Sequence, residues 1–236
     1  MVETTRYPLP GHVRIRLNSR SGAVDVVCEA RSDLEVEDAV GRRISVELVE
    51  QQVTVSGRGS SRLAIRCPAG TDLVIGSLSG SIEVRGRAGS VVVSSASGGI
   101  SLDEALSADL RTMSGRIAIR SVTGQLRAKS ASGSASADHA GRADIATVSG
   151  SVNLVDVKGE IRVHSVSGDV EVAGAGRDPV TVKTMSGGVT IRLPKEARPN
   201  PRFRHMSGHP RCDLVTGTDC EVAVSTMSGR VEVVAR

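Results

Sequence analysis

The sequence predicts an all-β fold, a single-stranded β-solenoid of about nine coils with a period of about 18 residues. Three observations predict it. A short motif of Ser or Thr, an apolar residue, Ser and Gly recurs through two-thirds of the chain. Val and Ile alternate with other residues on both sides of each copy, which is the period of a β-strand. The copies are almost evenly spaced, and a short regular period is typical of solenoids.

The repeat has a fixed register around its second Ser, which we number as position zero. The motif glycines are Gly80, Gly98, Gly115, Gly133, Gly150, Gly168, Gly187, Gly208 and Gly229. Apolar residues occupy positions minus six and minus four, and again plus three and plus five. Ile161 and Val163 before Ser167, and Val170 and Val172 after it, show the pattern.

The apolar residues lie at even positions before the central Ser and at odd positions after it, and this change predicts a corner. One continuous strand would turn half of these apolar residues outward, so the chain must bend at Ser-Gly. Glycine suits this bend because it adopts positive φ without a steric penalty. A second, looser corner is marked by other glycines: Gly89, Gly124, Gly141, Gly159 and Gly176. Each repeat is then one coil of two short strands, covered by neighbouring coils.

The chain before the regular repeats is predicted to contain β-strands of a less regular kind. Residues 13–26 already carry one coil-like unit around Ser21 and Gly22. Residues 28–57 alternate with drifting spacing, which predicts an atypical cap for one end of the stack. We therefore predict an irregular N-terminal region at residues 1–60 and a solenoid domain at residues 61–236.

Residues 194–212 interrupt the pattern. This segment contains Phe203, the only phenylalanine, and four of the eight prolines: Pro194, Pro199, Pro201 and Pro210. Pro210 occupies position plus three, where a hydrogen-bonding N–H is expected in a strand ladder. The sequence therefore predicts a proline-rich loop that bulges from the stack.

The last coil is predicted to be open, because the sequence ends directly after a regular Ser-Gly corner. Val231 and Val233 would lie at the rim of a half-covered core, and an uncovered strand edge is a template for another strand. We expect self-association through these residues, as a dimer or a filament. A monomer with a frayed last strand is the alternative.

Composition excludes some protein classes. No apolar run approaches the ~18 residues of a membrane-spanning helix, and the first twenty residues lack the apolar region of a secretory signal. The cysteines, Cys28, Cys67, Cys212 and Cys220, have no disulfide-framework spacing, so we expect free thiols and a cytoplasmic location. Arginines are scattered among 26 acidic residues and aromatic residues are nearly absent, which disfavours nucleic acid as a partner.

A known family shares these motifs. Tandem S/T-x-S-G-x-V/I-x-V coils follow Cys67-Pro68-Ala69-Gly70-Thr71, and Ile191-Arg192-Leu193-Pro194 comes late in the chain. Together they resemble a bacterial β-strand-repeat family of unknown function whose members are called putative adhesins. The resemblance covers roughly residues 60–236. It implies a β-solenoid fold and no catalytic residues.

Two residue patterns were considered as chemical sites. His205, His209, Cys212 and Cys220 have ligand types that zinc accepts, but the register turns both cysteines inward and His209 outward. We therefore expect no metal and no cofactor. The Ser and Thr columns lack a recurring base, so they are better explained as hydroxyls that bond to the backbone at the corner.

The sequence thus favours a non-enzymatic scaffold. It would be a structural or protein-interaction module, with a protein partner or a second copy of itself as the ligand. The alternative is a sensor that binds a small molecule or a metal through the Pro/His/Cys segment at residues 194–212. A metal assay on the purified protein would separate the two.

Overall fold

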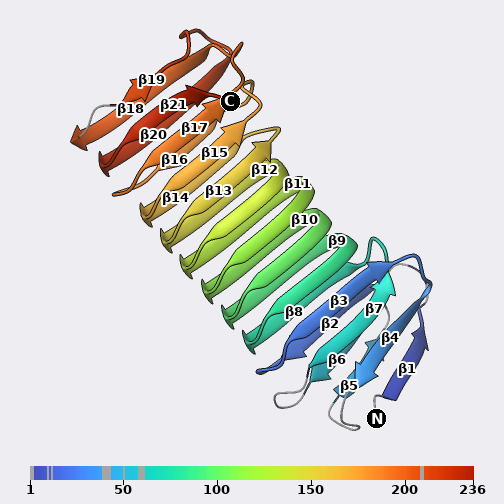
Figure 1. The fold of residues 1–236 in the computed structure, drawn as a ribbon. Coiled ribbons are helices and arrows are strands. Elements are labelled where there is room, and N and C mark those ends of the chain that lie inside the picture. Colours follow the sequence, from blue (N-terminus) through green and yellow to red (C-terminus); the bar gives the residue numbers. More distant parts are fainter. Residues whose placement is uncertain are drawn as a thin grey trace. The chain divides into compact units, whose positions relative to one another are not determined.

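The computed structural model describes residues 3–9, 11, 13–38, 44–49, 51–57, 62–207 and 210–236. These residues form strands and turns without any helix (Figure 1). The predicted all-β fold is confirmed, as a solenoid of about nine turns with a period of about 18 residues. Among the described residues, no helix is long and apolar enough to cross a membrane.

The chain forms two compact units, Met1–Ser121 and Val122–Arg236, and the boundary falls inside strand β11 (Ile117–Ser132). The strands of the first unit are β1 (Glu3–Pro8), β2 (Arg14–Ser19), β3 (Val24–Glu29), β4 (Asp33–Asp38), β5 (Ile44–Val49), β6 (Gln52–Gly57), β7 (Leu63–Pro68), β8 (Asp72–Ser79), β9 (Ile82–Ser97) and β10 (Ile100–Ser114). Those of the second are β12 (Ala135–Ser149), β13 (Val152–Val157), β14 (Ile161–Ser167), β15 (Val170–Gly174), β16 (Val180–Lys183), β17 (Val189–Leu193), β18 (Pro199–Ser207), β19 (Arg211–Cys212), β20 (Cys220–Ser228) and β21 (Val231–Ala235).

Parallel pairing between successive coils builds the first unit. β9 and β10 each run through the looser corner, and they pair along most of their length with Ile100 opposite Ile82. On the other side of β9, β8 pairs with its second half and β3 with its first half. Because like residues stack on like, the inward side chains form continuous apolar columns.

Strand order in space departs from strand order in sequence at the N-terminal end. β6 pairs with β2 and β7 pairs with β3, so β6 and β7 lie outside the coil that precedes them. β1, β4 and β5 extend this end with antiparallel pairings.

The strands predicted within residues 28–57 are present. The predicted boundary at residue 60 falls between β6 and β7, which flank the same coil, and the division into two domains there stays a prediction.

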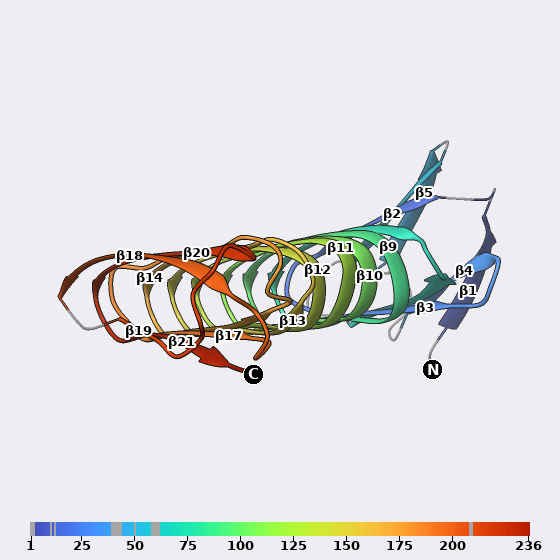
Figure 2. The same cartoon turned by 90° about the horizontal axis from the view of Figure 1, so that it is seen from above.

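The second unit has two walls (Figure 2). One wall contains β14, β16, β20 and β18, and the other contains β13, β15, β17, β21 and β19. In the second wall Val152, Val170, Val189 and Val231 are consecutive partners, and all are buried. These columns are the core that the repeat register predicts.

The proline-rich segment is not a loop, and this prediction was wrong. Residues 199–207 form β18, which pairs with β20, and β19 pairs with β21. Pro201 and Phe203 lie opposite Val222 and Val224, at the inward positions of a degenerate repeat. Proline suits this place because an outermost strand needs fewer N–H donors. Figure 1 shows β18 and β19 beyond β20 and β21.

The prediction of an open last coil is wrong for the same reason. β20 is held between β16 and β18, and β21 between β17 and β19. Val231 and Val233 are buried inside the unit. Self-association through these two residues stays a prediction. The first and last regular coils, β2–β3 and β20–β21, are both inserted between other coils.

Candidate interaction surface

A buried hydroxyl at position minus two closes seven of the Ser-Gly corners. Thr184 Oγ1 donates to the main-chain oxygen of Ser186 at 3.0 Å. The same bond, between 3.0 and 3.4 Å, is made by Ser77, Ser95, Thr112, Thr147, Ser165 and Thr226. The hydroxyl therefore donates a hydrogen bond to a main-chain carbonyl at the point where the strand direction changes, as predicted for the Ser and Thr columns.

The Ser at position zero links neighbouring coils. Ser167 Oγ donates to the main-chain oxygen of Val148 at 3.4 Å, and Ser207 Oγ to that of Met227 at 3.3 Å. The following glycine is equally constrained. Gly150 has a φ of 133°, and a Cβ there would collide with the main-chain oxygen of Gly133. The Ser and Gly columns are thus committed to structure rather than to nucleophilic chemistry.

The residue at position minus one points outward between these two hydroxyls. In the first unit Leu78 and Met113 are exposed there. In the second unit we call the corresponding set the apolar row: Val148, Val166, Met185, Met227 and Met206. Pairing of the adjacent serines keeps its members in register, at a strand spacing of about 4.8 Å. The row is therefore continuous across five coils.

Basic side chains lie beside the apolar row on the same wall. We call strands β14, β16, β20 and β18 the basic wall. Its outward, exposed cations are Arg162, Lys183, Arg202 and Arg204, with His164 among them. Glu221 is an acidic residue of this wall and forms an ion pair with Arg202 at 3.2 Å.

A groove follows β20 along the basic wall. In the middle of β20 the outward residues are small, Ala223 and Ser225, whereas Lys183 on β16 and Arg204 on β18 lie on either side. Glu221 of β20 and Arg202 of β18 also line the groove. The resulting depression has a volume of about 390 Å³. Because Met185, Met227 and Met206 lie two positions further along the same three coils, the groove opens beside the end of the apolar row.

The structure separates the residues considered as zinc ligands. His205 is opposite Thr226 on β20, whereas Cys220 is opposite Pro199, six residues away along β18. At ~3.3 Å per residue this is about 20 Å, too far for one ion. Cys212 lies on the other wall, and His209 is outside the described residues. In the part of the chain that the structure describes, no three His, Cys, Asp or Glu residues could hold a metal.

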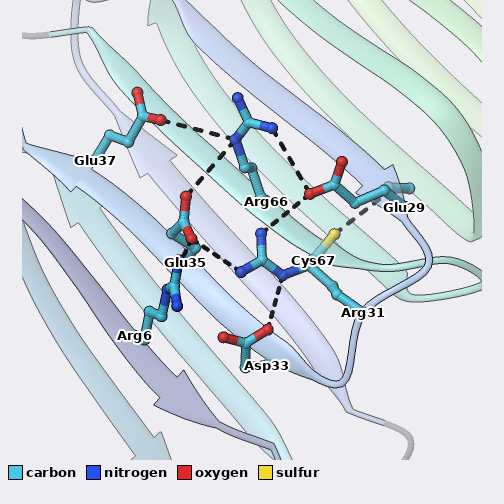
Figure 3. Close-up of polar contacts among 9 residues, drawn as sticks. Arg6, Glu29, Arg31, Asp33, Glu35, Glu37, Arg66 and Cys67 are labelled. Atoms are coloured by element: carbon cyan, nitrogen blue, oxygen red, sulfur yellow. Dashed lines mark hydrogen bonds and ion pairs between the residues drawn. The ribbon is translucent and has the colours of Figure 1, made fainter.

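A network of ion pairs covers β4 and its neighbours in the first unit (Figure 3). Arg31 is central and contacts Glu29 at 3.1 Å, Asp33 at 2.9 Å and Glu35 at 3.0 Å. Hydrogen bonds from this guanidinium lower the pKa of Asp33 and of Glu35 below their ordinary values. Arg66 adds longer contacts of 3.7 Å to Glu29 and Glu35. The charges are mutually satisfied, which favours a structural role for this network.

Sequence reasoning missed the apolar row and the basic wall. A signal was present, because the second residue of every motif copy is apolar although hydroxyl residues flank it. The group of cations could not be recognised because Arg202 and Arg204 lie in the segment predicted to be a loop. The pairing of β18 with β20 places them across β20 from Lys183.

The fold and its hydroxyl–glycine corners define a β-solenoid repeat protein. A family model described as Toastrack DUF4097 matches residues 12–233, and the chain belongs to this family. The resemblance inferred from the motifs is confirmed. The match also begins well before residue 60, which agrees with the coil at β2 and β3.

Solved structures share the fold at low sequence identity. A putative lipid binding protein from Parabacteroides distasonis is 14% identical with a TM-score of 0.63, over 99% of this chain and 96% of that chain. Putative adhesins from Parabacteroides distasonis and Bacteroides fragilis are 12% and 15% identical, with TM-scores of 0.51 and 0.50, over 99% of this chain and 97% of each of those chains. Comparison with curated proteins finds no match.

Proposed function

We propose that this protein is a non-enzymatic interaction scaffold, and that its basic wall and apolar row bind a protein segment rich in acidic and apolar residues. The single observation that carries the proposal is the exposed apolar row beside Lys183, Arg202 and Arg204. Contiguous exposed apolar surface with a polar rim is typical of interaction sites. Methionine side chains suit such a site because they adapt to different partners.

The opposite wall supports the choice of surface. There, Glu171 pairs with Arg192 at 2.8 Å and Glu232 with Arg230 at 2.7 Å, so exposed charges neutralise one another locally. On the basic wall Arg162 pairs with Glu160 at 2.6 Å and Arg202 with Glu221 at 3.2 Å, so Lys183 and Arg204 provide the excess of positive charge. These two cations would attract an acidic partner and accelerate its association. A non-enzymatic role agrees with the corners, since their hydroxyls are bonded to main-chain oxygens.

A binding assay with a defined probe tests the proposal. We expect a fluorescent peptide of alternating Glu and Leu to bind the full chain in a salt-sensitive manner. Lys183→Glu/Arg204→Glu should weaken binding about tenfold, because two favourable charge contacts become repulsive. Lys158→Glu/Lys195→Glu is the matched control, with the same charge change at exposed positions outside the basic wall. Equal binding by both variants would contradict the proposal.

A second candidate function has its own observation, the groove of about 390 Å³ between Lys183 and Arg204. Three cations and one carboxylate, Glu221, line the groove, and this excess of positive charge suits a small anionic ligand. Arg204 also belongs to the segment predicted to act as a sensor. The similar structure from Parabacteroides distasonis is described as a lipid binding protein, which makes an anionic lipid one such ligand. Vesicles containing an anionic phospholipid distinguish this function: binding of vesicles but not of the peptide would favour it.

A cytoplasmic location stays a prediction.

A further inference from the structure

Cys28 and Cys67 face each other across two parallel strands of the first unit. They are direct partners in the pairing of β3 with β7, and their Sγ atoms are 3.6 Å apart. Both are buried, with 5% of Cys28 and 0% of Cys67 exposed. On its other side Cys28 is opposite Gly86, which has no side chain. Cys67 is therefore the thiol partner that this arrangement gives to Cys28.

The two thiols differ in character. The hydrogen bond from Cys67 lowers the pKa of Cys28, whereas the same contact and burial raise the pKa of Cys67. Thiolates are the nucleophilic form of cysteine. Cys28 also retains a little exposed surface whereas Cys67 retains none, so we assign the first reaction with a small oxidant to Cys28.

We propose that Cys28 and Cys67 are a peroxide-reactive dithiol, which a hydroperoxide converts to a disulfide between β3 and β7. The Cys28 thiolate attacks one oxygen of the hydroperoxide, the O–O bond breaks, and Cys28 becomes a sulfenic acid. The other oxygen leaves as water or an alcohol after taking a proton. The sulfur of Cys67 then displaces hydroxide from Cys28, and the thiol proton leaves with it as water. One hydroperoxide is reduced and two thiols are oxidised.

The geometry permits the cross-link. A disulfide needs Cα atoms about 4.4–6.8 Å apart, and directly opposite residues of adjacent strands meet this requirement. The bond would close the chain between residues 28 and 67 and join β7 to β3. Because a cross-link restricts the unfolded chain, oxidation is expected to stabilise the first unit against unfolding.

The other two cysteines provide an internal comparison. Cys212 on β19 is opposite Val233, and Cys220 on β20 is opposite Pro199, on different walls of the second unit. Neither strand pairing gives them a thiol partner. If oxidation depended only on the reactivity of single thiols, Cys212 and Cys220 would also be oxidised. The proposed reaction oxidises Cys28 and Cys67 alone.

The test uses the full reduced chain and hydrogen peroxide at about one equivalent. We expect two of the four thiols to be lost, a peptide linking Cys28 to Cys67 in a non-reducing digest, and a higher unfolding temperature that dithiothreitol reverses. The variant Cys212→Ser/Cys220→Ser should behave in the same way. Oxidation without the Cys28–Cys67 peptide in the wild-type chain would overturn the proposal, and this result does not depend on any variant folding.

A trapping experiment tests the order of attack. In Cys67→Ser the sulfenic acid at Cys28 has no resolving thiol, so dimedone should label Cys28. In Cys28→Ser dimedone should not label Cys67. Labelling of Cys67 instead would overturn the assigned roles, while the linked peptide of the wild type reports separately on the pair itself.

Discussion

The buried hydroxyl at position minus two stabilises most of the Ser-Gly corners. Ser165 Oγ donates to the main-chain oxygen of Ser167 at 3.3 Å, whereas the buried Ser130 Oγ, at the same repeat position, has no hydrogen-bond partner among the described residues. Ser165→Ala should cost about 1 kcal/mol of unfolding free energy, because the Ser167 oxygen loses one of its two donors and keeps only the N–H of Gly150. Ser130→Ala, the matched control, should be neutral or slightly stabilising. Denaturant unfolding measures both, and equal losses would contradict the role of the bond.

Inward and outward positions of one strand should respond oppositely to charge. Val152 is buried in the apolar column of the second unit, and the adjacent Asn153 is exposed. Val152→Asp should destabilise by about 3–5 kcal/mol, since it buries an uncompensated charge between coils. Asn153→Asp is the control at an outward position and should change stability little. Similar losses in the two variants, measured by denaturant unfolding, would show that the register is wrong.

The ion pairs between Arg31 and the carboxylates of β4 should make the stability of the first unit depend on pH. Arg31 lowers the pKa of Asp33 and Glu35 in the folded state, so their ionised forms contribute stability above the ordinary values of 3.8 and 4.5. That contribution is lost as the pH falls through the folded values. Arg31→Gln should lower the unfolding temperature at pH 7, and the difference from wild type should shrink below about pH 4.

Arg16→Gln is the control for this element, because Arg16 is an exposed cation on β2. Its unfolding temperature should follow that of the wild type across the whole pH range. A difference between Arg31→Gln and wild type that is the same at pH 3 and at pH 7 would contradict the assigned ion pairs.

The regular strands and corners could be predicted from the sequence because each depends on residues close together in the chain. The change of the apolar residues from even to odd positions at Ser-Gly predicted each corner, and the alternation of apolar residues predicted that Val152 is buried and Asn153 exposed. The same register, applied to Ser207, places Pro201 and Phe203 at inward positions of a coil. The prolines were given more weight than this register, although proline is compatible with an outermost strand.

Strand order at the ends could not be predicted, because it depends on contacts between segments distant in sequence. Nothing local to β2 specifies that β6 will lie on one side of it and β8 on the other. The basic wall has the same origin, since it requires β18 to pair with β20. The thiol pair likewise joins residues on opposite sides of the irregular region.

At the scale of the whole molecule, the end of the second unit has a strand edge that can be tested. Among the described residues β18 pairs with β20 alone, so its other edge is available to another strand. Arg198 accepts a hydrogen bond from the N–H of Asp219 at 3.0 Å, which turns its main-chain groups toward β20. Because alternate residues of a strand direct these groups to opposite sides, the nitrogen of Pro201 faces the free edge. At Pro199 the main-chain oxygen accepts a hydrogen bond from the N–H of Gly217 at 2.9 Å, so that end of the strand is already occupied.

The missing donor at Pro201 should oppose the addition of another strand, since proline and charged residues are common protections of sheet edges. Pro201→Val restores this N–H group and adds a side chain that favours strands. We expect this variant to form larger species than the wild type over a concentration series in light scattering. Pro179→Val, at an exposed position before the inner strand β16, is the control and should scatter like the wild type. If Pro201→Val is no more associated than the control, this proline does not protect the edge, and the protection must come from the side chains of β18.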